Sequence, residues 1–570
     1  MLNRILPFLI ILLVYIIGAF IDVMDIDAAQ YASISREMVE NGQFLQVLHR
    51  GQDYLDKPPL LFWVSSFVFY LLGAGSITYR LAPILSSLLT IYATYRIARL
   101  YYSERIAYFS ALVIASCQAF FLMNHDVRTD TMLTTWATVA VWQIAAFQKY
   151  GKHRYWIGAA VAVGLAMLAK GPIGLIVPVL AFGTDFLLRL DFRAFFRWQW
   201  LAGLLIVGLI LLPMSWGLYQ QFDLQPQKVF DGKQGVSGLR FYYWTQSFGR
   251  ITGESQWDND AGVFFQAQNF LWSFLPWVLL FVPALVSETW VVLGKAFRLQ
   301  KEEESFVWAG FVLPFLALSL SRYQLPHYTF VVFPLAAILT AKWLDFLLKE
   351  STARSYVRWA LGGQIFVFVV VLFLILALSV WAFPAYDVFF WIVLTIGMGA
   401  CVYMFFNKRN VQMQLVYSSL VMITVANFAL NYHVYPTLLK YQIGSVLGKI
   451  LYENKEIAKE RFYVLVRVTG DDRDIFLHSL DFYSQRINPQ LASAEELLKK
   501  DKKQTHWVYT DAVGYTEIKQ LPAVQVEVLQ QFDKYHVAVL TLPFLNPAMR
   551  PSQVQKVFLL KVNFSITVRP

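Results

Sequence analysis

The sequence predicts a polytopic α-helical membrane protein that ends in a small soluble α/β domain. Hydrophobic residues make up 57% of the 570 residues, charged residues only 15%, and the mean hydropathy is +0.48. An average soluble domain is about 45–50% apolar and about 25% charged. Apolar stretches of span length recur up to residue 431, and charge runs such as Lys499-Lys-Asp-Lys-Lys503 follow them. This composition excludes a soluble enzyme and a disordered chain.

Thirteen stretches are apolar enough to cross a bilayer as helices, given that a span needs about 20 mostly apolar residues. They are residues 5–22, 79–101, 104–124, 131–148, 156–170, 172–190, 200–220, 268–294, 306–321, 326–347, 359–383, 387–406 and 411–431. We expect the first to be an uncleaved span, because no small-x-small cleavage site precedes the acidic stretch that follows it. Residues 60–73 are apolar but short, so we expect them to lie along the membrane interface.

Basic residues mark alternate loops, which predicts an N-terminus on the cytoplasmic side. Each loop predicted inside carries at least two positive charges: Arg96, Arg99 and Arg105; Lys149, Lys152 and Arg154; Arg189, Arg193 and Arg197; Lys295, Arg298 and Lys301; Lys342, Lys349, Arg354 and Arg358; Lys408 and Arg409. We attribute the formal net charge of +10 to these loops and expect no nucleic-acid partner. The alternation predicts a multi-pass location in a cell membrane.

Two domains are expected. Residues 1–435 form the membrane domain, with long outer loops at 23–78 and 221–267, and residues 436–570 form an α/β domain on the periplasmic side. In this second domain, β-like runs at Phe462–Val466, Trp507–Tyr509, Val524–Leu529 and Val537–Leu540 alternate with helical patterns such as Ser493–Lys500. The sequence has only two cysteines, Cys117 and Cys401, which excludes a disulfide scaffold and a Cys-rich metal site. Both lie in apolar runs, so we expect them to be buried.

The first outer loop carries polar residues close to the membrane. Asp27 and Tyr31 are four residues apart and share a face of a helix. A carboxylate at hydrocarbon depth costs roughly 2.5–3.5 kcal/mol and is usually functional, although a solvated helix N-cap is the alternative here. Further on, Pro58-Pro59 stops any helix and presents Lys57 from a turn. That lysine suits an anionic lipid headgroup, or it is an ordinary interfacial lysine that reaches to water.

More polar residues fall on the same predicted side. Asp126, Arg128 and Asp130 open the fourth span, and with Asp27 they form either a polar site or an ion network that caps a helix end. Further outer groups are Lys170-Gly171-Pro172, Phe248-Gly249-Arg250 with Glu254, and Ser321–Tyr328. Each alone is typical of a membrane anchor. Their shared position on the predicted outer side of the membrane favours a functional site.

Together these segments resemble the GT-C class of lipid-linked-sugar glycosyltransferases, in particular the bacterial aminoarabinose lipid A transferase branch, which is related to the protein O-mannosyltransferases. The matching motifs, in order, are Asp27-x-x-x-Tyr31, Tyr54-x-Asp56-Lys57-Pro58-Pro59, Asp130, Lys170-Gly171-Pro172, Phe274-Leu275-Pro276-Trp277 and Leu325-Pro326-x-Tyr328. The resemblance covers about residues 1–430. It implies a GT-C fold of about thirteen transmembrane helices with a periplasmic α/β tail.

The sequence departs from the family pattern at three points. Ala28 stands where the family often has an acid, and Asp56 where it commonly has Glu. Some relatives place a metal-holding histidine in the second long outer loop, but no histidine occurs between His153 and His327. A divalent metal is therefore left open, and no other cofactor is indicated. The resemblance thus implies the reaction class, while the sugar and the acceptor stay open.

The implied reaction transfers a sugar from a polyprenyl (undecaprenyl) phosphate donor to a lipid or protein acceptor, with inversion, at the outer face of the membrane. The resemblance implies Asp27 as the catalytic base and Asp130 as a catalytic residue that holds the sugar or positions Arg128. The expected substrate-binding residues are Tyr31, Tyr54, Asp56, Lys57, Arg128, Lys170, Arg250 and Tyr328. The alternative is a secondary transporter or lipid flippase. The sequence shows neither an internal repeat nor mid-span charges that would favour it.

Overall fold

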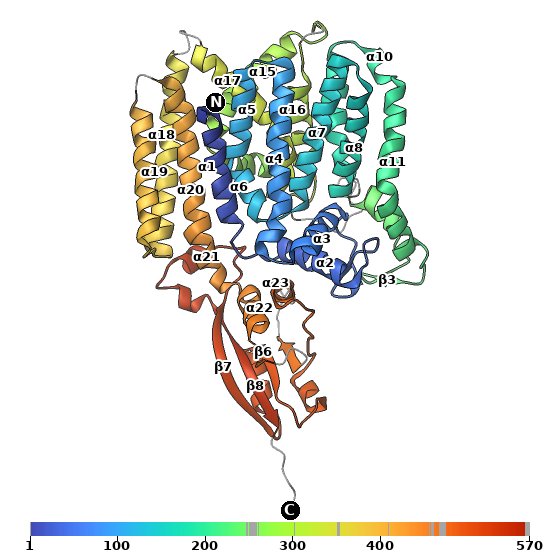
Figure 1. Ribbon diagram of the computed structural model, residues 1–570, viewed down its shortest axis with the longest axis vertical. Helices are drawn as coiled ribbons and strands as arrows, with labels where there is room; N and C mark the ends of the chain where they lie inside the picture. The colour runs from blue at the N-terminus through green and yellow to red at the C-terminus, as the bar shows by residue number, and fades with distance from the viewer. Residues whose placement is uncertain are drawn as a thin grey trace, which may run out of the picture.

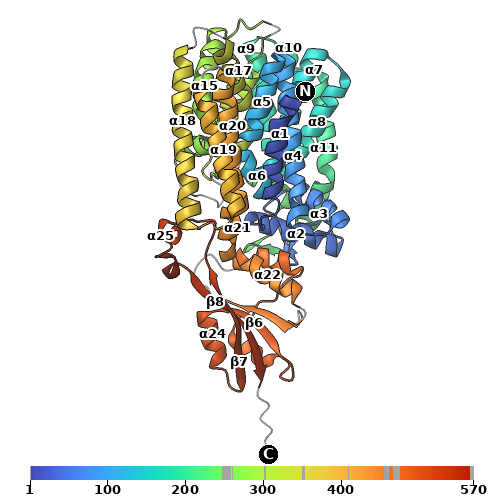
Figure 2. The same cartoon turned by 60° about the vertical axis from the view of Figure 1, so that its left-hand side comes forward.

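The computed structural model describes residues 2–246, 249, 259, 261–300, 303–349, 354–407, 410–454, 456–457, 461–466 and 475–564. Its described part divides into a long helical bundle and a smaller sheet-containing domain below one end of the bundle (Figure 1). The outer loops lie between the two (Figures 1 and 2). This arrangement agrees with the predicted division into a membrane domain and a C-terminal α/β domain, whose boundary at residue 435 stays a prediction.

The bundle consists of apolar helices. They are α1 (Leu2–Gly18), α4 (Ser76–Tyr101), α5 (Glu104–Ser116), α6 (Gln118–His125), α7 (Thr129–Tyr150), α8 (His153–Lys170), α9 (Ile173–Leu188), α10 (Phe192–Phe195), α11 (Trp198–Leu218), α14 (Phe265–Ser273), α15 (Val278–Gly294), α16 (Phe306–Ser319), α17 (Phe333–Lys349), α18 (Arg354–Leu376), α19 (Val388–Phe406) and α20 (Ser418–Ala429). Each of the thirteen predicted spans falls on one of these helices or on a consecutive pair.

Six helical segments in the described residues are long and apolar enough to cross a membrane, or seven if the bent pair α5 and α6 forms one span. The number thirteen therefore stays a prediction. The outward surface of the bundle supports a lipid environment, because Leu205 on α11, Phe373 on α18 and Ile396 on α19 are 72%, 68% and 67% exposed. Exposing such apolar side chains to hydrocarbon costs no free energy, whereas in water they would form an aggregation-prone surface.

The first outer loop folds into short elements across the end of the bundle: α2 (Asp27–Asn41), the hairpin of β1 (Leu48–His49) and β2 (Gln52–Asp53), and α3 (Leu60–Leu72). Figure 1 shows α3 lying across the bundle end, where the short apolar stretch 60–73 was expected. The second loop contains η1 (Tyr219–Asp223), β3 (Val229–Phe230), β4 (Lys233–Gln234), α12 (Gly238–Arg240) and η2 (Phe241–Thr245).

The C-terminal domain is built on a four-stranded mixed sheet in the order β5-β6-β8-β7. The strands are β5 (Phe462–Leu465), β6 (His506–Asp511), β7 (Val524–Lys534) and β8 (Gln555–Phe564). Strand β5 pairs with β6 in parallel, and the other pairs are antiparallel. Its helical segments are α22 (Ile443–Glu453), α23 (Ile475–Ser484), η10 (Ala494–Lys499), α24 (Ala512–Lys519), α25 (Leu542–Leu545) and η11 (Arg550–Ser552).

One predicted strand is wrong. Residues Val537–Leu540 form a turn, and the fourth strand is β8 instead. The physical reason is that Val537 packs into an apolar cluster with Phe383, Val434 and Phe544, which joins the two domains. This short apolar run therefore forms part of the contact between the two domains and does not pair with a neighbouring strand. The helix of the last predicted span also runs on through η7 (Leu430–Val434), α21 (Tyr435–Leu438) and η8 (Leu439–Tyr441).

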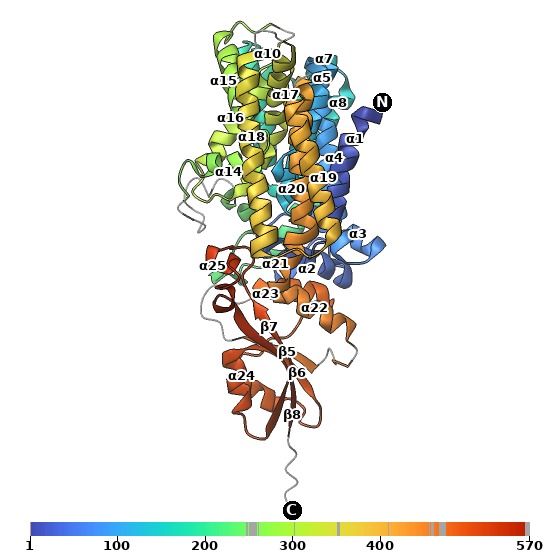
Figure 3. The same ribbon diagram turned by 90° about the vertical axis from the view of Figure 1, so that its left-hand side faces the viewer.

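Polar bonds hold the C-terminal domain against the first outer loop, which carries the candidate site. The bonds run from Ser33 Oγ to the His478 carbonyl (2.8 Å), from Ser479 Oγ to Asp25 Oδ2 (2.9 Å), from the Asp25 amide to Gln442 Oε1 (2.9 Å), and between the side chains of Arg50 and Asp481. Helix α23 is the main partner of this loop, and Figure 3 shows the domain directly below α2. The position of the candidate site therefore depends on contacts with both domains.

Candidate active site

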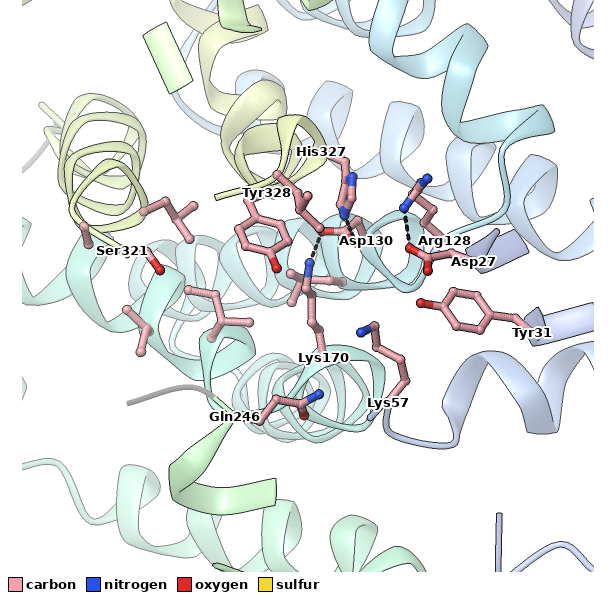
Figure 4. A pocket seen from close by; sticks show the side chains of 16 residues that line it. Asp27, Tyr31, Lys57, Arg128, Asp130, Lys170, Gln246, Ser321, His327 and Tyr328 are labelled. Carbon is pink, nitrogen blue, oxygen red and sulfur yellow. Dashed lines mark hydrogen bonds and ion pairs between the residues drawn. The ribbon is translucent and has the colours of Figure 1, made fainter. Parts of the chain in front are cut away.

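A cavity of about 140 Å³ lies at the end of the bundle that faces the C-terminal domain and is named here the central cavity (Figure 4). Its polar lining residues are Asp27, Tyr31, Lys57, Arg128, Asp130, Lys170, Gln246, Ser321, His327 and Tyr328. Its apolar walls are Leu133, Ile173, Ile176, Ala317, Leu318 and Leu325. Seven of the ten residues expected in the site line this cavity. Apolar walls beside charged groups suit an amphipathic ligand.

Helix α2 places Asp27 and Tyr31 on the face that borders the cavity. Asp27 is the first residue of the helix and Ile26 is its cap, and the Asp27 side chain makes no capping bond. The N-cap alternative is therefore excluded. Tyr31 is 1% exposed, and its hydroxyl points toward the Asp27 carboxylate in Figure 4. Burial, and then the nearby Asp27, raise the pKa of Tyr31 well above its usual value, so this hydroxyl stays a hydrogen-bond donor.

Arg128 bridges two carboxylates at the wall of the cavity. Its Nη1 donates to Asp27 Oδ2 at 2.6 Å, and its Nε donates to Asp126 Oδ2 at 2.7 Å. This fork fixes one oxygen of Asp27. Within the described part of the chain, the other oxygen, Oδ1, accepts no hydrogen bond. Asp27 thus presents a fixed carboxylate with one oxygen available to a ligand.

The Lys-Gly-Pro turn brings Lys170 to the opposite side of the cavity. Lys170 is the last residue of α8, where a cation complements the helix dipole. Gly171 has a φ of +83°, which favours glycine, and Pro172 caps α9. The Lys170 ammonium lies 2.5 Å from Asp130 Oδ1 and 4.0 Å from the centre of the Tyr328 ring. The second oxygen of Asp130 lies 3.6 Å from His327 Nε2.

The ion-pair contacts described for the Asp130 side chain are with Lys170 and His327, and neither joins it to Arg128. Its carboxylate is 4% exposed and positions Lys170, while the expected role in holding the sugar stays a prediction. His327 and Tyr328 reach the pair from η3 (Pro326–Val332). The Leu-Pro-x-Tyr motif therefore supports the cation on this side of the cavity.

The Pro-Pro turn places Lys57 at the cavity. Helix α3 begins at Leu60 directly after Pro59, as the two prolines predict. The Lys57 ammonium pairs with Asp56, points into the cavity in Figure 4, and is 18% exposed. Asp56 also accepts a hydrogen bond from Gln246 Nε2 at 3.4 Å. Asp56 therefore holds Lys57 rather than lining the central cavity itself.

Besides Asp56, two expected residues are not placed in the central cavity. Tyr54 is buried in a neighbouring hollow that Lys57 also borders. Arg250 lies outside the described residues, as does Glu254. In the other direction, Gln246, Ser321 and His327 line the cavity without having been among the expected site residues. Ser321 and His327 belong to the segment Ser321–Tyr328 that the sequence analysis noted as a polar group, whereas no motif includes Gln246.

A metal ion has no evident cage in the described residues. No group of three or more His, Cys, Asp or Glu side chains comes together there as metal ligands would. Lysine and arginine occupy the positions next to Asp27 and Asp130 instead.

Sequence comparisons identify a matching family and related proteins. A family model described as dolichyl-phosphate-mannose-protein mannosyltransferase matches residues 56–216. The chain is 25% identical over 346 residues to the undecaprenyl phosphate-alpha-4-amino-4-deoxy-L-arabinose arabinosyl transferase 2 of Proteus mirabilis, with 59% of each chain covered. It is also 25% identical over 320 residues to the corresponding transferase of Erwinia tasmaniensis, covering 55% of this chain and 54% of the relative. The chain spans less than two thirds of these relatives.

The structural comparisons extend over more of the chain. ArnT from Cupriavidus metallidurans bound to undecaprenyl phosphate matches with a TM-score of 0.71 at 19% identity, covering 97% of both chains. The oligosaccharyltransferase of Archaeoglobus fulgidus in the apo form matches with a TM-score of 0.51 at 11% identity, covering 85% of this chain and 65% of that one. The resemblance to the GT-C glycosyltransferases and to their aminoarabinose transferase branch is thus confirmed. The mannosyltransferase family model matches residues 56–216, the two arabinosyl transferases match over 346 and 320 residues, and the fold matches over nearly the whole chain.

Proposed function

We propose that the chain transfers a sugar from a polyprenyl phosphate donor to an acceptor at the periplasmic face of the inner membrane, with inversion at the anomeric carbon. The observation that carries the proposal is the make-up of the central cavity. Among its described lining residues, Lys57, Arg128 and Lys170 are cations and Asp27 is a carboxylate with an available oxygen. Apolar walls lie beside these charged groups. A prenyl phosphate has the same combination of apolar chain and anionic head.

Lys57 and Lys170 are suited to stabilise the phosphate leaving group. When the bond between the anomeric carbon and the phosphate oxygen breaks, the prenyl phosphate leaves as a more negative anion. Cations held in place before the reaction stabilise that charge without reorganisation. Lys57 is held by Asp56, and Lys170 is held by Asp130 and Tyr328. Arg250 is proposed as a further phosphate ligand on the resemblance alone.

Asp27 is suited to the role of general base. The acceptor oxygen attacks the anomeric carbon from the face opposite the phosphate, and its proton passes to the Asp27 carboxylate. Arg128 holds Oδ2 of Asp27, which leaves Oδ1 to take the proton. Tyr31, from the same helical face, donates a hydrogen bond to the sugar or to the phosphate. General-base catalysis of this kind is typically worth 10²–10⁴-fold in rate.

The test is turnover of a panel of undecaprenyl phosphate sugars by the purified chain, with an envelope extract as the acceptor source. Asp27→Asn preserves the side-chain shape and should lower transfer by at least about a hundredfold. The matched control is Glu40→Gln on the same helix, because Glu40 is exposed and pairs with Arg36 away from the cavity.

The two variants separate the proposal from its competitors. Loss in Asp27→Asn with normal transfer in Glu40→Gln supports the base. Equal activity of both variants removes Asp27 from the mechanism. A transporter or flippase would move the donor across vesicles without cleaving its phosphodiester, so an intact donor after incubation would contradict the transferase proposal.

A further inference from the structure

A cavity of about 370 Å³ lies within the bundle between α8, α9 and α11 and is named here the lateral cavity. Apart from Gln199, its described lining side chains are aliphatic or aromatic. The aromatic ones are Trp156, Phe182, Phe186, Phe195 and Trp200. None of the roles proposed above requires this cavity.

The spacing of small residues explains why the three helices leave this space. A Cβ atom at Gly174 of α9 would lie 2.6 Å from the Ala166 carbonyl carbon, and one at Gly164 of α8 would lie 2.9 Å from Ile210 Cδ1. Glycine therefore lets α8 pack closely against α9 and α11 at these two points. Further from the C-terminal domain, the cavity is bordered by side chains too small to fill it: Ala159, Ala160 and Gly203.

The lateral cavity opens to the outside of the bundle. Val179 of α9 and Leu204 of α11 line it and are nevertheless 55% and 52% exposed. Figure 1 shows α11 at the edge of the bundle, beside α8. In a membrane, this opening faces hydrocarbon. Apolar cavities stay dry and take up apolar groups, so a lipid chain is the natural occupant.

The cavity lies in the half of the bundle farther from the C-terminal domain. Figures 1 and 2 show α10 at that end, and Phe195 of α10 closes the cavity there. Its lining on α11 runs from Gln199 to Val207, a rise of about 12 Å. One leaflet is about 15 Å of hydrocarbon, half of a bilayer core. Exposed Phe196 and Trp198 at this end are typical of the membrane interface.

Uncompensated positive charge lies at the same end. Lys152 precedes α8, Arg193 lies on α10 and Arg197 precedes α11. Arg197 donates to the neutral Gln148 at 2.9 Å, and within the described residues Lys152 and Arg193 form no ion pair. Basic groups beside a gap between transmembrane helices are typical of sites for anionic lipid headgroups.

We infer that the lateral cavity holds an acyl chain of an anionic phospholipid of the inner leaflet, with its phosphate bound by Arg193 and Arg197. The inference takes only the orientation of the chain from the proposed function. The lipid is not a substrate. Its chain lies against Pro178 and Val179 of α9, whereas Ile173 and Ile176 of the same helix line the central cavity.

The test titrates the purified, delipidated chain in a nonionic detergent and counts bound lipids by native mass spectrometry. The probes are phosphatidylglycerol and phosphatidylcholine with identical acyl chains. Phosphatidylglycerol should bind at least about fivefold more tightly, the effect of one cation near a lipid surface. Arg193→Gln, which changes an exposed side chain, should lower phosphatidylglycerol affinity by about the same factor and leave phosphatidylcholine affinity unchanged.

A matched pair of variants on α11 tests the cavity itself. Gly203→Phe places a ring in the cavity, where a Cβ atom meets only the Ala160 Cβ at 3.6 Å. It should weaken phosphatidylglycerol binding at least about tenfold, the loss expected when two methylene groups are no longer buried. Gly208→Phe is the control, because Gly208 is exposed, lies outside the cavity and has open space around its Cβ position. Its binding should be unchanged.

The contrary results are distinct. Equal affinities for the two lipids in wild type would overturn the anionic headgroup, whether or not Gly203→Phe folds. Phosphatidylglycerol binding that survives Gly203→Phe, or that falls equally in Gly208→Phe, would overturn the cavity assignment. Release of phosphatidylglycerol by added undecaprenyl phosphate would assign the cavity to a prenyl chain instead. Labelling of a cysteine at Lys152 from outside intact cells would overturn the inner leaflet. Absence of sugar transfer with intact phosphatidylglycerol binding would refute the proposed function alone.

Discussion

Replacing Lys170 with methionine should destabilise the protein by leaving a buried carboxylate without its cation. The Lys170 ammonium lies 2.5 Å from Asp130 Oδ1, and the two side chains are only 17% and 4% exposed. Removing one partner of a buried ion pair costs about 3–5 kcal/mol, because the remaining charge stays desolvated. His327 Nε2 lies 3.6 Å from the other Asp130 oxygen, which places the expected cost near the lower end.

The expected shift in melting temperature follows from the size of the chain. Unfolding entropies average about 2.1 cal/mol/K per residue, so a chain of 570 residues has roughly 1.2 kcal/mol/K. A loss of about 3 kcal/mol then lowers the melting temperature by about 2.5 °C. The measurement is thermal unfolding in detergent, followed by tryptophan fluorescence, for Lys170→Met, Asp130→Asn and the double variant.

The double variant is decisive because a neutral asparagine needs no cation. Lys170→Met combined with Asp130→Asn should regain most of the stability that Lys170→Met loses. The control is Lys228→Met, whose partner Asp53 is 20% exposed and keeps more of its water, so its loss should be smaller. Additive losses in the double variant would refute the reasoning that the pair is coupled through a buried charge.

Three further predictions concern the donor, pH and orientation. Lys57→Met should weaken the apparent donor affinity about 10- to 150-fold, the range of a charge-assisted hydrogen bond, and an unchanged donor dependence would place the phosphate elsewhere. Because burial raises the pKa of Asp25 to about 7, above its unfolded value of about 3.9, the folded state holds this proton more tightly. The stability contribution is complete below about pH 4 and is lost as the pH rises toward 7. The thermal stability of wild type relative to Asp25→Asn should fall over that window, and a constant difference would contradict it. An impermeant thiol reagent should label a cysteine at the exposed Lys502 and spare one at Lys152 in intact cells, with the buried native cysteines silent. The reverse pattern would overturn the orientation.

Local rules predicted those parts of the site that short motifs determine. The four-residue spacing of Asp27 and Tyr31 becomes one face of α2, and the Pro58-Pro59 stop becomes the start of α3. The turn after Lys170 follows from the chemistry of glycine and proline. In each case the backbone preference lies within a few residues of the side chain, so no knowledge of tertiary contacts is needed.

Features that depend on contacts between residues far apart in the chain could not be predicted from the sequence. Gln246 reaches the central cavity from the second long loop, and no motif in the sequence includes it. Val537 was assigned to a strand because short apolar runs have the same composition in strands and in domain contacts. The partner of Asp130 was also missed, because Lys170 lies 40 residues further along the chain.

The bonds between α2 and α23 have a consequence for engineering. Asp481 is completely buried beneath Arg50, and Ser33 of α2 donates to the backbone beside it. A chimera that joins the bundle of this chain to the C-terminal domain of a relative would break these bonds at the base of the helix that carries Asp27. Exchange of residues 23–56 together with 443–488 keeps the contact matched. The unit that must be exchanged to transplant this domain between relatives is therefore discontinuous in sequence and cannot be a simple C-terminal graft.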